Sequence, residues 1–139
     1  MVSARLDALI RDPIERTYLS RDDGYWADLV LAEFSFLEER GGLLDAVAFH
    51  QKGDYVRYRG PWGQVWIEFA PDNYPGGRWL YGGANLHGTT AQFEGDLDRL
   101  VFERQPAVPL PVSNPLDRAT IALNVRFWAD LLRSSTDLF

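Results

Sequence analysis

Hydrophobic and polar residues alternate with a period of two between residues 55 and 69. Side chains of a β-strand point to opposite faces in turn, so the alternation predicts two strands with one apolar and one polar face. The apolar face carries Val56, Tyr58, Val65, Ile67 and Phe69, and the other face carries Tyr55, Arg57, Arg59, Gln64, Trp66 and Glu68. The segment Gly60-Pro61-Trp62-Gly63 between them predicts a tight turn, which makes the whole stretch a β-hairpin.

Two further segments extend the predicted hairpin into a sheet. Residues 43–50 and 78–82 are rich in apolar residues, and short turn-like segments separate them from the hairpin. Connections of this length join antiparallel neighbours. We therefore expect an antiparallel meander of about four strands over residues 43–84.

The first 42 residues have helical periodicity. Apolar residues recur at helical spacing at Trp26, Leu29, Val30, Phe34 and Leu37. Ser3 predicts the cap of a first helix that continues to about Arg11, and Asp12-Pro13 predicts the start of a second. Ser20 predicts the cap of a third, and Gly41-Gly42 predicts its end, because glycine tolerates the left-handed turn that leaves a helix.

The C-terminal part is also predicted to be helical. Thr90 is expected to cap a short helix through about Glu103, and residues 106–115, with four prolines, read as an extended crossover. Asn114-Pro115 predicts the start of a long helix with an apolar stripe of Ile121, Val125, Trp128 and Leu132. The prediction is one α+β domain over residues 1–139: helical in 1–42, sheet in 43–84, and helical in 85–139, with N- and C-terminal helices packed on the sheet.

Composition narrows the class of protein. The chain has 139 residues, 46% of them hydrophobic, and no cysteine, which indicates a globular domain without disulfides or thiolate metal sites. The N-terminus lacks the apolar core of a signal peptide, and no stretch approaches the roughly 18 apolar residues of a membrane span. We expect a cytoplasmic protein that does not bind a membrane.

The net charge of the chain indicates which classes of partner it would attract or repel. The formal net charge is −6, and the acidic excess falls on the two helical segments. Because this field repels phosphate, we expect no nucleic-acid binding, whereas a basic protein partner would be attracted. Negative charge that only maintains solubility is the alternative.

The chemistry of an enzyme is not evident in the sequence. His50 and His87 stand in no motif, and nucleophile, dinucleotide, phosphate-loop and metal-binding motifs are missing from the sequence. The adjacent glycines Gly82-Gly83 are followed by no lysine. We therefore expect no catalytic residue, no metal and no cofactor, and the balance leans against an enzyme.

Aromatic and arginine residues mark the predicted partner-binding surface, because this mixture is typical of interface hot spots. The candidates are Arg57, Arg59, Trp62, Trp66, Asp72, Tyr74, Trp79 and Tyr81. On this hypothesis Trp62, Trp66, Trp79, Arg57 and Arg59 are substantially exposed. The alternative is an ordinary sheet whose second face is covered by a helix, so that the rings belong to the core.

The order of the predicted helices and strands resembles that of a known group of proteins. A helix ends in FSFLEERGG, a strand pair follows in GDYVRYRG and QVWIEFAPD, and the chain finishes in IALNVRFWADLLRSSTDLF. This pattern resembles a group of small bacterial α+β proteins that includes immunity proteins of polymorphic toxin systems. The resemblance implies a non-catalytic protein that binds and neutralises a cognate toxin.

Two other functions remain open from the sequence. A small-ligand binder or enzyme would have a pocket between sheet and helices, lined by Tyr58, Trp79, Tyr81 and Trp128. A structural or assembly subunit would have a large symmetric interface.

Overall fold

The computed structural model describes residues 2–20, 24–50, 53–74, 77–105 and 118–139, and only the backbone of residues 71–74 and 77–79. In chain order the elements are α1 (Ala4–Leu9), α2 (Pro13–Leu19), α3 (Tyr25–Glu33), α4 (Phe36–Glu39), β1 (Leu43–Phe49), β2 (Asp54–Gly60), β3 (Gly63–Tyr74), β4 (Gly77–His87), β5 (Gln92–Asp96), α5 (Leu97–Arg104), α6 (Arg118–Ser134) and a 3₁₀ turn, η1 (Thr136–Leu138). The α+β class and the antiparallel sheet are confirmed, with five strands in place of about four.

Local capping explains where the first helices begin. The Ser3 hydroxyl accepts a hydrogen bond from the Leu6 amide at the start of α1, and the Asp12 carboxylate accepts from the Ile14 amide at 2.8 Å at the start of α2. Ser20, predicted to cap the next helix, instead ends α2. The helix α3 begins after Gly24, whose φ of 66° suits glycine.

The end of the helical segment is fixed by two glycines. Gly41 has a φ of 85°, and the Gly42 amide donates to the Leu37 carbonyl at 2.8 Å. This is the bond pattern of a Schellman motif, and it directs the chain from α4 into β1. The helical segment ends at Gly41-Gly42 as predicted, but the single helix expected from Ser20 is divided into α3, which ends at Glu33, and the short α4.

The five strands form a meander in the order β1-β2-β3-β4-β5, and all neighbours are antiparallel. In the central hairpin Val56 pairs with Ile67 and Tyr58 with Val65, so the predicted register and its two faces are confirmed. A bulge interrupts the β1–β2 pairing between Leu44 and Ala46.

The fifth strand corrects the prediction of a helix from Thr90. Residues Gln92–Asp96 pair with β4, and β4 itself continues to His87, beyond the predicted end at residue 82. Gly95 has a φ of 139°, a backbone conformation that glycine accommodates and helices do not use. The helix is therefore confined to Leu97–Arg104.

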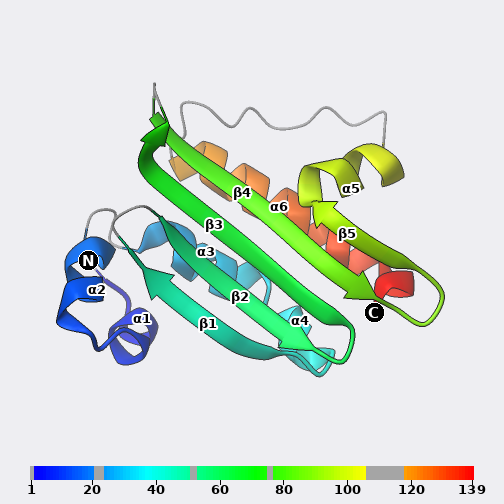
Figure 1. The fold of residues 1–139 in the computed structure, drawn as a ribbon, viewed down its shortest axis with the longest axis horizontal. Helices are drawn as coiled ribbons and strands as arrows, with labels where there is room; N and C mark the ends of the chain where they lie inside the picture. The colour runs from blue at the N-terminus through cyan, green and yellow to red at the C-terminus, as the bar shows by residue number, and fades with distance from the viewer. Residues whose placement is uncertain (1, 21–23, 51–52, 75–76, 106–117) are drawn as a thin grey trace.

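One face of the sheet carries the helices (Figure 1). The helices α3 and α6 lie behind the strands in this view and contact each other, and α5 contacts β4, β5 and α6. The predicted apolar stripe of α6 is buried with the core face of the hairpin. The predicted crossover at 106–115 and the Asn114-Pro115 start lie outside the described residues. None of the described helices is long and apolar enough to cross a membrane.

Candidate interaction surface

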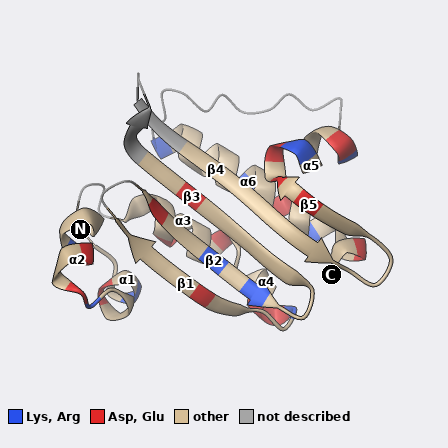
Figure 2. Ribbon diagram, viewed as in Figure 1, with Lys and Arg blue, Asp and Glu red and all other residues tan. Residues whose placement is uncertain are grey.

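The face of the sheet opposite α3 and α6 carries no described helix over its central strands (Figure 1). We call this the open face. On β2, β3 and β4 it consists of Tyr55, Arg57, Arg59, Gln64, Trp66, Glu68, Tyr81, Gly83 and Asn85. Its charges alternate by strand, because basic positions on β2 lie between acidic positions on β1 and β3 (Figure 2).

The antiparallel register brings these side chains into rows across the strands. Glu68 lies opposite Tyr55 on one side and Tyr81 on the other, and Trp66 lies opposite Arg57 and Gly83. Directly opposed residues share a face and are within side-chain reach. The register therefore gathers a carboxylate, two phenol rings, an indole and a guanidinium at the centre of the open face.

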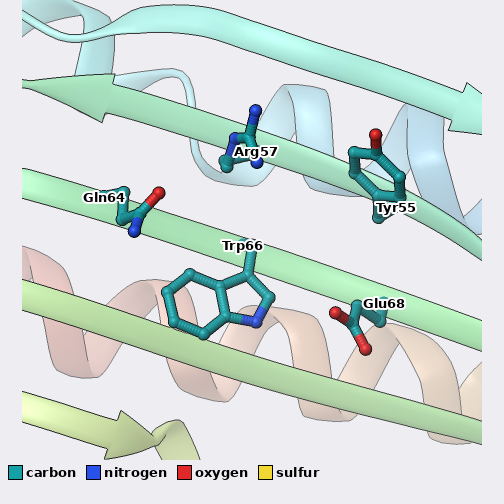
Figure 3. A pocket seen from close by; sticks show the side chains of 5 residues that line it. All are labelled: Tyr55, Arg57, Gln64, Trp66 and Glu68. Carbon is teal, nitrogen blue, oxygen red and sulfur yellow. The ribbon is translucent and has the colours of Figure 1, made fainter.

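Five of these side chains line an open pocket of about 270 Å³, which we call the central pocket (Figure 3). Its lining residues are Tyr55, Arg57, Gln64, Trp66 and Glu68. A second depression of about 230 Å³ adjoins it through the shared Gln64 and is lined also by Arg59, Gly60, Gly63 and Asn85. The concave part of the open face thus extends from Glu68 toward the hairpin turn.

The position of the Trp66 indole depends on Gly83, the residue opposite it on β4. A Cβ atom on Gly83 would lie 2.5 Å from the indole atoms Cε2 and Cζ2 of Trp66, which is closer than any carbon contact allows. The missing side chain lets the indole lie over β4, where it is half-buried. One part of the ring is held against the strand and the rest borders the central pocket.

The two arginines of β2 are tied to one carboxylate. Asp45, in the bulge of β1, accepts from Arg57 Nε at 2.6 Å and lies 3.8 Å from Arg59. In Figure 3 the Arg57 side chain points toward β1, away from Trp66 and Glu68. Partly exposed ion pairs contribute little to stability, typically below about 1 kcal/mol, so the main effect of Asp45 is to orient and neutralise Arg57.

Glu68 is half-buried, and its carboxylate makes no hydrogen bond or ion pair with any described residue. Burial raises the pKa of Glu68, because removing water disfavours the charged form. The carboxylate therefore lies among rings without the cation or donor that would compensate its lost hydration.

Tyr81 stands beside Glu68 as a neutral phenol. Its hydroxyl donates to the Asp96 carboxylate of β5. Burial first, then this hydrogen bond and the charges of Asp96 and Glu68, raise the pKa of Tyr81 to about 12. On this side Glu68 therefore faces a neutral phenol and, beyond it, the carboxylate of Asp96.

The structure confirms only part of the predicted exposure. Arg59 is exposed, Arg57, Trp66 and Tyr81 are half-buried, and all four lie on the open face. Asp72 and Tyr74 belong to β3 and Trp79 to β4, but their side chains lie outside the described residues.

The expectation that Trp62 is exposed is wrong. Trp62 is 3% exposed, its Nε1 donates to the Arg40 carbonyl at 3.0 Å, and its ring meets Phe139 edge-on at 5.1 Å. A Cβ on Gly60 or Gly42 would lie 2.7 Å from the indole. These two glycines make room for the ring to fold back from the turn into the core.

Three residues of the central pocket were missing from the predicted site: Tyr55, Gln64 and Glu68. Their alternation with the core residues of the hairpin already placed them on the correct face. Asp45 and Asp96 carried no such signal, since one depends on a bulge and the other on the unpredicted strand β5.

Comparison with protein-family models, curated proteins and solved structures finds no match to this chain. Within the described ranges, no three His, Cys, Asp or Glu side chains converge as metal ligands would. The open face is therefore the feature of this chain that bears on its function.

Proposed function

We propose that this chain is a non-catalytic, cytoplasmic protein-binding module that docks a basic protein through the open face. In its most specific form it is an immunity-type inhibitor of a cognate toxin. The observation that carries the proposal is the central pocket, in which Trp66 and Tyr55 border charged and amide groups on a face free of described helices.

The residue types of the open face favour a protein partner. Tyr, Trp and Arg dominate the energetics of protein interfaces, since they combine large apolar area with polar groups. The strands hold these side chains at fixed spacing, so little ordering is needed on binding. The net charge of −6 favours encounter with a basic surface.

The positions of the aromatic residues argue against the predicted ligand pocket between sheet and helices. Tyr58 and Trp128 are 1% and 2% exposed and belong to the core. Tyr81 is paired with Glu68 and lies on the opposite face of the sheet from Tyr58. These residues cannot line one pocket, which supports a surface site over an internal one.

Co-purification of the tagged full chain with the products of genes adjacent to its own tests the proposal. We expect a basic protein to bind the wild type, and Trp66→Ala to raise the Kd by at least about 30-fold, the effect of an interface hot spot. Phe102→Ala is the matched control, because Phe102 is 67% exposed but lies on α5. Equal binding by both variants would contradict the proposal.

An assembly subunit is distinguished in the same preparation by light scattering. If the open face binds a second copy, the wild type is a dimer that Trp66→Ala converts to a monomer. Such a result would replace the heterologous partner with the chain itself.

A further inference from the structure

Glu68 is the residue of the open face whose surroundings indicate the chemistry of a group that could bind there. It is half-buried, has no hydrogen bond or ion pair among the described residues, and stands between Tyr55 and Tyr81. A desolvated carboxylate is stabilised most by a cation that also donates hydrogen bonds. The surrounding rings favour the same group, because their faces attract cations.

Among the residues that the structure describes, no charge around the central pocket compensates Glu68. Arg57 is the described cation that lines the central pocket, but its guanidinium is bound to Asp45 at 2.6 Å on the side of β1. On the side of β4, Tyr81 donates to Asp96 and adds no positive charge. Asp45 balances only one of the two β2 arginines, and the second, Arg59, lines the adjoining depression near the hairpin turn and not the central pocket that holds Glu68.

We infer that the central pocket receives an arginine side chain of the protein partner, whose guanidinium pairs with Glu68 and lies against the rings of Tyr55 and Trp66. This inference rests on the proposed function and specifies the chemistry of the partner. The Gln64 amide oxygen is a further acceptor at the other end of the pocket (Figure 3). A carboxylate beside aromatic rings suits a planar guanidinium, which stacks on ring faces and pairs with a carboxylate through two parallel donors, whereas an ammonium is a compact point charge.

The test is a titration of the ¹⁵N-labelled full chain with Nα-acetyl-arginine methylamide, followed by NMR. We expect weak, saturable shifts confined to the amides of Tyr55, Trp66 and Glu68 and to the Trp66 indole N–H. The citrulline analogue has nearly the same shape without the charge and should produce none. Glu68→Gln should weaken binding of the arginine probe at least about tenfold, as expected on losing a charge-assisted hydrogen bond.

The control variant is Asp130→Asn, which removes an exposed carboxylate on α6, with a side chain 74% accessible, and should leave the titration unchanged. The amide spectrum of each variant reports directly whether it is folded. Equal shifts from arginine and citrulline, retention of binding in Glu68→Gln, or equal affinity for the lysine analogue would each overturn the inference. Shifts centred on Arg57 and Arg59 on adding inorganic phosphate, with none from arginine, would assign an anion site instead.

The arginine inference and the proposed function can be contradicted independently of each other. A protein partner that Trp66→Ala releases and Glu68→Gln retains would uphold docking on the open face and overturn the arginine assignment. If the arginine probe binds at Glu68 but no protein partner depends on Trp66 for binding, the arginine site stands and the proposed docking of a protein on the open face is contradicted.

Discussion

The indole of Trp66 lies over Gly83, the residue opposite it on β4, at a distance that leaves no room for a Cβ atom. A glycine in a strand interior ordinarily weakens a sheet, since it adds backbone entropy and no packing. Here the indole covers the bare backbone and supplies that packing. The same contact sets the tilt of the ring that borders the central pocket.

Gly83→Ala should therefore disturb the open face through Trp66. We expect a loss of about 1 kcal/mol in the free energy of unfolding, because the ring must move but lies on the surface and can swing away. In a Trp66→Ala background the same change should be neutral or stabilising, since no ring stands in the way. Urea denaturation of the four proteins of this double-mutant cycle measures the coupling. An equal cost in both backgrounds would show that the contact has no energetic effect.

The two tryptophans of the hairpin should differ sharply in their effect on stability. Trp62→Ala removes a 3% exposed ring with a hydrogen bond to the Arg40 carbonyl, so we expect a loss of about 3–5 kcal/mol. Trp66→Ala should cost about 1 kcal/mol, because its ring is only half-buried. Chemical denaturation monitored by circular dichroism tests this contrast, and similar losses would mean that the two rings are equally part of the core.

Asp98 should be important for the packing of α5 on α6. Its carboxylate accepts a hydrogen bond from Trp128 Nε1 at 2.9 Å, and Trp128 is 2% exposed. Asp98→Ala leaves the buried indole N–H without an acceptor, and we expect a loss of about 1–3 kcal/mol. Asp130→Ala, which removes only an exposed pair with Arg133, should change stability by less than about 0.5 kcal/mol. A thermal melt of both variants compares them, and equal shifts would exclude a special role for the Asp98 bond.

Glu68 should give stability a pH dependence of defined sign. The pKa of Glu68 is raised in the folded state, so folding is favoured when this group is protonated and less favoured when it is ionised. Relative to the wild type, Glu68→Gln should be more stable at neutral pH. The difference should shrink as the pH falls through the raised folded pKa toward the ordinary pKa of glutamate. Urea titrations at a series of pH values test this, and a difference that grows toward acid pH would mean that Glu68 is stabilised as the carboxylate.

The sequence predicted the parts of the fold that depend on local periodicity and capping. The alternation from Tyr55 to Phe69 fixed the register of β2 and β3, because a slip of one residue would turn Val56 and Ile67 toward water. The caps at Ser3 and Asp12 were evident since each cap reaches only two or three residues along the chain.

Features set by distant contacts could not be predicted in this way. The inward turn of Trp62 requires Gly42 and Phe139, which lie far from it in the sequence. The strand β5 depends on pairing with β4 and on the positive φ of Gly95, so its five residues alone resembled the start of a helix. Whether a helix also covers the second face of the sheet was likewise undetermined, because it depends on where the helices dock.

The bulge of β1 has a consequence for how the protein behaves in a crowded cell. An edge strand recruits other chains when it offers an unbroken row of backbone donors and acceptors. The bulge beside Asp45 twists that row on β1, and at the opposite margin β5 has five residues and leads directly into α5. Both margins are poor templates for added strands, so we expect the molecule to resist fibril growth and to be recognised by its side chains rather than by its backbone.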